Sequence, residues 1–323
     1  MGINLSEVNL AYLKEKKQYK YAIKDINLRI DNEDEFIAIV GHTGSGKSTL
    51  VQVLNNLLVP TFGHISINFR ENNNDVYYNI KASGKKVKYA ISKDEVNVKY
   101  KSRVSLKALR KHIGLVFQFP EYQIFEETVL KDIMFGPKNF LRDENKAKEE
   151  AIKIAEMMNI SDLLDKSPFM LSGGQMRKVA IAGILASKPE VLVLDEPTVG
   201  LDPIAKRDLL EFLKYLNEVE HKTIIIITHD MDVVGEYAKR TIVLNKGCIM
   251  YDGSKDEMFK NDEVIKTCNL NYPNIVKILA NLKKKLNIDL DIYKYNIDDA
   301  FKELNRVLGD NHEWENCVWT IYQ

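Results

Sequence analysis

The stretch FIAIVGHTGSGKST, residues 36–49, decides the fold. Its first part, FIAIV, is a short apolar run that stops abruptly at Gly41, which is typical of a buried parallel strand that enters a tight turn. The next eight residues, 41–48, fit the spacing GxxxxGK[ST], and helical spacing follows over residues 47–57. A strand, a glycine-rich turn and a helix in this order predict a phosphate-binding loop.

The residues of this loop supply what a phosphate group needs. Glycines let backbone N–H groups turn inward around a β-phosphate, and the N-terminus of the following helix adds a favourable dipole. The Lys47 ammonium is expected to neutralise β- and γ-phosphate oxygens, and the Ser48 hydroxyl to bind Mg²⁺. The nucleotide-binding residues expected here are Gly41, His42, Thr43, Gly44, Ser45, Gly46, Lys47, Ser48 and Thr49.

A second motif, VLVLDE at residues 191–196, brings two adjacent carboxylates to the end of an apolar strand. Open α/β sheets bind their ligands at the carboxyl ends of the strands. Asp195 is therefore expected to hold Mg²⁺, through water, and Glu196 to polarise an attacking water molecule as general base. Together with the loop at 41–48, this motif predicts a P-loop nucleotide hydrolase.

Composition narrows the class of protein further. The chain has 323 residues, of which 45% are hydrophobic, enough for one large core or two smaller ones. The 46 Lys and Arg residues balance 46 Asp and Glu residues, so no overall field favours nucleic acid, and we expect no nucleic-acid partner. The segment between Glu71 and Lys111 is locally basic, with eleven Lys and Arg against four Asp and Glu. We interpret residues 71–105 as an inserted, exposed hairpin or loop.

The sequence predicts neither a membrane span nor a disulfide framework. A span needs roughly 18 to 20 consecutive apolar residues, whereas the strongest run, TIIIIT at 223–228, has only the length of a strand. The N-terminal residues show no basic region followed by an apolar one, so no secretory signal is expected. Cys248, Cys268 and Cys317 have unrelated spacings, which fits a reducing cytosol and argues against a zinc site.

Strand and helix patterns alternate along most of the chain. Strands are expected at 3–10, 23–30, 36–40, 63–69, 112–117, 191–194 and 223–227, and helices at 47–57, 128–160, 173–186, 204–219, 274–286 and 298–308. This alternation indicates a parallel α/β sheet with a helical insert. The tail, which holds Trp314 and Trp319, is expected to form a small appended domain.

Further signals stand in a fixed order around these two motifs. LSGGQ at 171–175 opens a predicted helix, Gln118 follows a strand, GLD at 200–202 follows VLVLDE, and His229 ends the run TIIIITH. With the phosphate loop, these resemble the complete motif set of the ABC ATPases over residues 3–253. The resemblance implies an ATPase domain at 1–254, with a RecA-like core, an N-terminal antiparallel β subdomain and a helical signature subdomain at 119–187. It also implies a small, mainly helical accessory and dimerisation domain at 255–323.

The family binds two ATP molecules between two ATPase domains arranged head to tail. A Ser-Gly-Gly helix start offers N–H donors to a γ-phosphate, but Lys47 and Asp195 already surround that phosphate on the same chain. The signature residues Ser172, Gly174 and Gln175 are therefore expected to act on the ATP of a partner subunit. The resemblance also implies that Asp202 contributes to the nucleotide interface, that Gln118 binds Mg²⁺ and that His229 hydrogen-bonds the γ-phosphate. The expected catalytic set is Glu196, His229, Gln118 and Lys47.

Three tyrosines are candidates for the residue that stacks on adenine. Tyr12 matches the aromatic that stacks on adenine in this family, but Tyr19 and Tyr21 are competing candidates because the charged stretch between them loosens the match.

Residues 116–140 and 171–203 are very similar to the ATPase subunits of energy-coupling-factor importers, which take up vitamins or transition-metal ions, and closest to the second ATPase type. This implies ATP and Mg²⁺ as ligands, a second ATPase in a heterodimer, a separate membrane substrate-binding subunit and a place on the cytoplasmic face of the membrane. A transmembrane scaffold is expected to dock between Phe119 and Glu127, where acidic residues alternate with aromatic ones.

Three alternatives stay open. A homodimer is compatible with a chain that holds every motif, and a conventional ABC importer would differ only in its partners. A soluble ABC ATPase of DNA repair or translation is disfavoured, because the stretch from Gln118 to Leu171 is too compact for a coiled coil and the chain holds one cassette.

Overall fold

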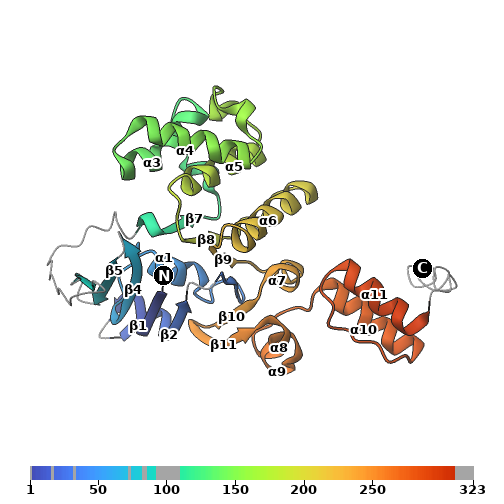
Figure 1. Cartoon of the computed structure of the whole chain (residues 1–323). Helices are drawn as coiled ribbons and strands as arrows, with labels where there is room; N and C mark the ends of the chain where they lie inside the picture. Colours follow the sequence, from blue (N-terminus) through green and yellow to red (C-terminus); the bar gives the residue numbers. More distant parts are fainter. Residues whose placement is uncertain are drawn as a thin grey trace.

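The computed structural model describes residues 2–15, 18–31, 34–71, 74–81, 86–91 and 110–309. Two β-sheets form its centre, a group of helices (green) stands at one end, and a helical pair near the C-terminus (red) lies to the side (Figure 1). No helix in the described part of the chain combines the length and the apolar content that a membrane span requires. The tryptophans Trp314 and Trp319 and the basic residues 92–109 lie outside the described residues.

A six-stranded sheet carries the phosphate-binding loop. Its strand order is β11-β10-β3-β9-β8-β7, and neighbours are parallel except for β10 and β11. The strands are β3 (Phe36–Val40), β7 (Ile113–Val116), β8 (Val191–Asp195), β9 (Thr223–Ile227), β10 (Arg240–Asn245) and β11 (Cys248–Ser254). The apolar runs predicted β3, β7, β8 and β9, which are buried along their whole length, and the patterns missed β10 and β11.

Alternate residues of β3 point into two different cores. Ile37 and Ile39 pack with α1 (Lys47–Leu54) and with the second sheet, whereas Phe36 and Val40 pack with the helices on the opposite face. A strand that is covered on both faces needs apolar residues at every position, which is why FIAIV shows no alternation. The sheet is thereby fixed between two layers, and the loop after β3 leaves from a rigid base.

The second sheet is antiparallel, with the order β2-β1-β4-β5-β6, and confirms the expected N-terminal β subdomain. Its strands are β1 (Gly2–Glu15), β2 (Gln18–Asp31), β4 (Phe62–Glu71), β5 (Asn74–Lys81) and β6 (Lys86–Ile91). Strands β5 and β6 fall within the expected insertion, but β5 is no exposed excursion. Val76, Tyr78 and Ile80 alternate toward the core and are nearly inaccessible, because the hairpin extends the sheet.

The helical group consists of α3 (Val129–Leu141), α4 (Glu144–Met157) and α5 (Gly173–Leu185). The patterns predicted one helical region over 128–160, and the structure divides it at Arg142, whose φ of 57° is left-handed. Thr128 caps α3 and Asp143 caps α4 through their side chains, so each helix has its own start. The helix expected at 47–57 likewise ends early, at Leu54.

The remaining helices are α6 (Pro203–Glu218), α7 (Met231–Tyr237), α8 (Lys255–Lys260), α9 (Asp262–Thr267), α10 (Asn274–Leu286) and α11 (Ile297–Leu308). Apolar residues of α8 and α9, such as Phe259 and Ile265, join the large core beneath the six-stranded sheet. The last two helices instead share a small core of their own, formed around Leu279, Leu282 and Leu290. The patterns predicted α10 at its observed bounds and α11 to within one residue.

Candidate functional site

The phosphate-binding loop leads into α1 without a side-chain cap. Gly46 is the N-cap residue, with a left-handed φ of 104°, and a Cβ atom there would lie 2.7 Å from the carbonyl oxygen of Ala22. Glycine is required at this position by both the backbone and the packing. Because no side chain caps the helix, the first N–H groups of α1 are left for a ligand, and they carry the positive end of the helix dipole.

A polar pocket lies beside this loop. It brings together residues of the phosphate loop, the strand end of β8, the segment after β7 and the N-terminal sheet. Its lining consists of Tyr12, Ala22, Thr43, Gly44, Gly46, Lys47, Ser48, Thr49, Gln118, Asp195 and Glu196. The other predicted loop residues, Gly41, His42 and Ser45, form the loop without lining the pocket. Two sequence motifs that lie far apart along the chain therefore meet in one place, as a shared nucleotide site requires.

The Lys47 ammonium folds back onto the loop. Its Nζ donates hydrogen bonds to the carbonyl oxygens of Gly41, at 2.7 Å, and His42, at 3.1 Å. Burial lowers the pKa of Lys47, while the nearby carboxylates of Glu196 and Asp195 act in the opposite direction. A partly buried cation that is held by neutral carbonyl groups is suited to an incoming phosphate anion.

The Asp195 carboxylate lies beside Ser48 and Lys47. Burial raises the pKa of Asp195, and a hydrogen bond from the Ser48 side chain and the charge of Lys47 oppose that rise. No group of three or more His, Cys, Asp or Glu side chains that could hold a metal ion occurs among the described residues. Mg²⁺ commonly takes one or two carboxylates and completes its shell with water and phosphate oxygens. The oxygen donors Ser48, Gln118 and Asp195 fit such an ion.

Glu196 has a strained backbone, and its two carboxylate oxygens have different surroundings. Its φ of 50° is left-handed, and its N–H donates to the carbonyl oxygen of Ile227 at 3.0 Å. One carboxylate oxygen, Oε1, lies 2.9 Å from Nδ1 of His229. The other, Oε2, is buried and has no hydrogen-bond partner among the described atoms. An unpaired buried carboxylate oxygen is costly, so Glu196 is held in an unfavourable setting at the edge of the pocket.

Tyr12 lies in the pocket, and its two competitors do not. Its side chain is exposed, and its hydroxyl lies 3.1 Å from the hydroxyl of Thr49 on α1. Tyr19 instead packs edge-on against Phe62, with ring centroids 5.5 Å apart, and lies 5.8 Å from Tyr21. The geometry favours Tyr12 as the aromatic residue that faces a bound nucleotide.

The signature residues lie outside this pocket. Ser172 caps α5, and a capping box joins it to Gln175, with N–H to oxygen distances of 3.3 Å and 3.0 Å. A Cβ atom at Gly173 or Gly174 would have nothing within 4 Å. Asp202 similarly caps α6, accepting hydrogen bonds from Ile204 and Ala205 at 3.0 Å each. Ser172, Gly174, Gln175 and Asp202 are thus not brought to the phosphate loop of their own chain.

Three aromatic side chains after Gln118 are exposed: Phe119, Tyr122 and Phe125. The acidic residues among them are less available than the sequence suggested. Glu121 lies 3.4 Å from the buried guanidinium of Arg177, and Glu127 lies 2.6 Å from Lys131. The charge of Glu121 is therefore balanced within the chain, and the three aromatic side chains remain exposed.

Arg177 is a residue that the sequence motifs missed. From α5, its Nη1 atom donates to the carbonyl oxygens of Pro197 and Val199, at 3.1 Å and 2.5 Å, and so ties the signature helix to the segment after Glu196. A signal was available, because Arg177 lies one helical turn before the buried Ile181 and thus on the buried face.

Comparisons with known proteins show the family to which this chain belongs. The ABC transporter family model matches residues 23–199. The energy-coupling factor transporter ATP-binding protein EcfA2 of Ligilactobacillus salivarius is 42% identical over 312 residues, covering 96% of this chain and 99% of the relative. The EcfA2 protein of Clostridium tetani is 41% identical over 324 residues, covering 98% of this chain and 100% of the relative.

Solved structures are similar as well. CbiO1 from Clostridium perfringens, described as part of the ABC transporter complex cbiONQ, has a TM-score of 0.64 at 32% identity and covers 88% of this chain and 98% of its own. The dimeric ATP-binding cassette MJ0796, bound to ADP and Pi, has a TM-score of 0.61 at 29% identity and covers 78% of this chain and 98% of its own. This chain therefore belongs to the ABC transporter family and, within it, to the energy-coupling factor ATP-binding proteins.

Proposed function

We propose that this chain is the ATP-hydrolysing subunit of an energy-coupling-factor importer and powers the uptake of vitamins or transition-metal ions. In this proposal the pocket binds ATP: the ring of Tyr12 stacks on adenine, and the N–H groups of the loop and Lys47 hold the β- and γ-phosphates. Ser48, Gln118 and Asp195 hold Mg²⁺, which neutralises charge on the phosphate oxygens. Glu196 takes the proton of the attacking water, and His229 holds the Glu196 carboxylate through Oε1.

The observation that carries this proposal is the separation of two phosphate-binding helix starts. The pocket at α1 holds the loop, both carboxylates and Gln118, whereas the signature start of α5 lies outside it with open space at Gly174. A second ATPase subunit, turned head to tail, would bring its own pocket to that open face. The dimeric state of the similar cassette MJ0796 supports this arrangement.

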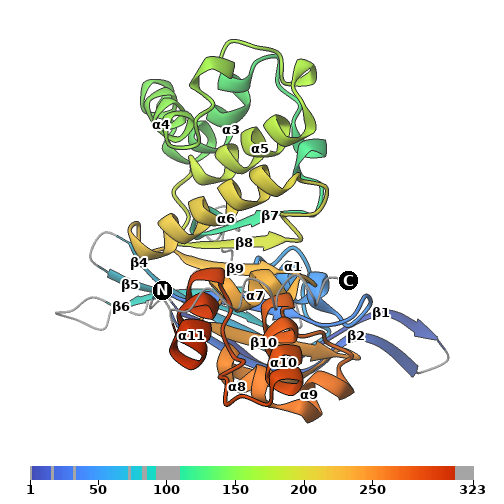
Figure 2. The same cartoon turned by 90° about the vertical axis from the view of Figure 1, so that its right-hand side faces the viewer.

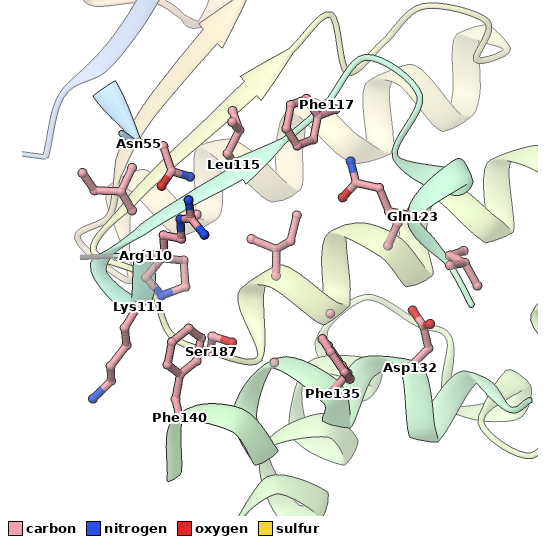
Figure 3. Close-up of a pocket in the computed structure, with 18 of the residues that line it drawn as sticks. Asn55, Arg110, Lys111, Leu115, Phe117, Gln123, Asp132, Phe135, Phe140 and Ser187 are labelled. Carbon is pink, nitrogen blue, oxygen red and sulfur yellow. The ribbon is translucent and has the colours of Figure 1, made fainter. Parts of the chain in front are cut away.

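A hollow beside the segment after Gln118 is the proposed docking place for the membrane scaffold. Figure 3 shows Phe117, Phe135 and Phe140 around it, with Gln123 and Asp132 at one end. Phe125 packs edge-on against Phe135, with ring centroids 4.8 Å apart, so the aromatic wall is ordered. An apolar segment from a membrane subunit fits this lining, and docking there would hold the chain on the cytoplasmic face of the membrane.

Purification in mild detergent tests the proposal. The tagged chain should bring down a second ATPase, a multispanning scaffold and a small membrane substrate-binding protein, identified by mass spectrometry. Tyr122→Ala should weaken capture of the scaffold, since this exposed aromatic directly precedes Gln123, which lines the hollow, whereas Tyr215→Ala, which removes an exposed tyrosine from α6, should not. Capture of ribosomal or DNA-repair proteins in place of membrane subunits would contradict the proposal.

A further inference from the structure

The position of His229 depends on its backbone. Its side chain is 72% exposed, and its only hydrogen-bond partner among the described residues is Glu196. Packing around the ring is therefore slight among the described residues. The residue lies on a short link between the end of β9 and the start of α7, so whatever holds α7 also holds His229.

Helix α7 is attached to α6 on one side. Asp230 caps α7 by accepting hydrogen bonds from the N–H groups of Asp232 and Val233, and its other carboxylate oxygen binds the ammonium of Lys206. At the far end of α7, the Tyr237 hydroxyl donates to Glu211 at 2.8 Å. These bonds tie the link that carries His229 to the helix that follows Asp202.

On its other side α7 contacts the start of α10; Figure 2 views the molecule from the side on which α10 and α11 lie. Asp232, in the first turn of α7, accepts two hydrogen bonds of 2.6 Å from Asn274, one from its backbone N–H and one from its side-chain amide. Helix α10 has no side-chain cap at its own N-cap residue, Pro273. A carboxylate three residues from His229 thus supplies the N-terminal cap of α10.

A second contact brings the same surfaces close. A Cβ atom at Gly235 would lie 3.0 Å from the ring of Tyr295 and 3.2 Å from Pro273, so the absence of a side chain on α7 permits the approach. Lys255 donates a hydrogen bond to the carbonyl oxygen of Gly235 and lies 5.0 Å from the centre of the Tyr295 ring. The C-terminal segment is therefore seated on α7 at two successive turns.

We propose that Asp232 is a positioning residue for ATP hydrolysis: through its paired hydrogen bonds to Asn274, the C-terminal segment sets the place of His229 against Glu196. The inference rests on the proposed function, since it needs His229 to act in hydrolysis. Its consequence is that the C-terminal helices form part of the catalytic framework of their own subunit. Asp232 itself is not a catalytic residue, because it binds α10 and not the nucleotide.

The experiment uses the full chain in the assembly with which it co-purifies, and compares kcat and KM for ATP with the binding of a fluorescent ATP analogue. Asp232→Ala should lower kcat about tenfold, because a small displacement of a catalytic group is costly, and should leave KM and analogue binding within about twofold. His229→Ala gives the loss of kcat that follows from removing the His229 side chain, and the loss in Asp232→Ala is compared with it. If Asp232→Ala does not fold, Asp232→Asn should show the same split in a weaker form.

The pair Asp232→Asn with Asn274→Asp provides a rescue. The amide introduced at position 232 can still accept the backbone N–H of residue 274 through its oxygen, and its NH₂ group can donate to the new carboxylate. The double variant should therefore regain most of the kcat that each single variant loses. A matched control is the cap inside the C-terminal segment, where Asn296 and Asp299 exchange hydrogen bonds of 2.8 Å and 2.9 Å. Asp299→Ala removes a carboxylate that accepts the side-chain amide of Asn296, as Asp232 accepts that of Asn274, but away from α7, and it should lower Tm with kcat unchanged.

Three results would overturn the inference. The first is a wild-type kcat in Asp232→Ala, and the second is an equal loss of kcat in Asp299→Ala, which would mean that any weakening of the C-terminal helices suffices. The third is a double variant with a kcat no higher than that of the single variants. A wild-type assembly that binds and hydrolyses no ATP would instead contradict the proposed function, so the two failures are distinguishable.

Discussion

Two glycine-rich helix starts in this molecule look alike in sequence and differ in construction. At α1, Gly46 has a left-handed backbone and lies against Ala22, and no side chain caps the helix. At α5, Ser172 and Gln175 close a capping box, and Gly173 and Gly174 have open space where a side chain would stand. At α1 the backbone and the packing of the chain itself require glycine, whereas at α5 no neighbouring described residue does.

The difference indicates which side of each site lies in another molecule. A glycine that its own fold requires stabilises the structure wherever it is used. A glycine in an ordinary helical backbone with free space around it costs helix stability and must have a reason outside the described part of the chain. Under the proposed function, close approach of a phosphate that is held by a partner subunit supplies such a reason for Gly174. The α1 start of one subunit and the α5 start of its partner would then form the two halves of one ATP site.

The largest effect is expected from a change in the half of the ATP site that is built around α1. Glu196→Gln should lower ATP turnover by about 10² to 10⁴, the range typical of a lost general base, and should leave ATP binding intact. ATP-dependent association of the subunits should persist and become long-lived, because the γ-phosphate is no longer removed. Phosphate release and light scattering measure the two quantities.

The control for this variant is Glu144→Gln, which changes an exposed carboxylate at the start of α4. Turnover that stays at the wild-type level in Glu196→Gln would show that another group accepts the proton.

The next prediction compares alanine at the two glycines directly. Gly46→Ala should lower Tm by several degrees, since it combines a left-handed φ with a contact of 2.7 Å and costs on the order of 1 to 3 kcal/mol. Gly174→Ala should leave Tm unchanged or raise it, while ATP turnover falls about tenfold because the new methyl group occupies the space reserved for the phosphate. Thermal unfolding and phosphate release give both readouts.

The comparison fails if Gly174→Ala destabilises the isolated chain as much as Gly46→Ala does. In that case the signature glycine would have a structural reason within its own subunit.

Much of the architecture could be predicted from the sequence, because buried parallel strands have a distinctive composition. FIAIV, VLVLD and TIIII are apolar at nearly every position, and a strand covered on both faces requires this. Strand β11 escaped prediction because it pairs antiparallel at the edge of the sheet and alternates exposed and half-buried residues. Helix α7 was missed because seven residues are too few for a periodic pattern.

The candidate site followed from spacing only in part. Motifs predicted Lys47, Ser48 and Asp195 in one pocket, because the strand order brings the loop after β3 near the end of β8. No spacing predicted that Asp232 would cap α10, because that contact joins residues 42 positions apart through tertiary packing. Likewise, the acidic residues after Gln118 read as an open charged groove until the structure paired Glu121 with Arg177.

A smaller effect is expected from Tyr12, the residue proposed to stack on the adenine base. Tyr12→Ala should raise KM for ATP about tenfold, which corresponds to the typical free energy of base stacking on an aromatic ring, with kcat little changed. Tyr12→Phe loses the hydroxyl contact with Thr49 but keeps the ring, so it should remain near the wild-type KM. Steady-state kinetics over a range of ATP concentrations provides the measurement.

Tyr19→Ala and Tyr21→Ala are the matched controls, since both tyrosines lie on the same hairpin and outside the pocket. A rise in KM in either of them, with Tyr12→Ala unaffected, would reassign the stacking residue.

The smallest effect concerns the charges of the α1 half and depends on pH. Because burial raises the pKa of Asp195, the native state keeps its proton at a pH where the unfolded chain, with a pKa of about 3.9, has released it. The free energy of unfolding therefore falls as pH rises through this window. Without nucleotide and Mg²⁺, the Tm of Asp195→Asn should exceed that of the wild type by up to about 2 °C at pH 7 and by less at pH 4.

Glu303 in α11 provides a control of opposite sign. Hydrogen bonds from Arg306 and from the N–H of Asp291 lower the pKa of Glu303 to about 2, so its contribution to stability is present above the unfolded pKa of about 4.3 and is lost as pH falls toward 2. Glu303→Gln should thus fall below the wild type at pH 7 and approach it in acid, whereas Asp195→Asn exceeds the wild type most at pH 7. If the Tm difference from the wild type changed with pH in the same direction for both variants, the pKa of Asp195 would not be raised in the native state.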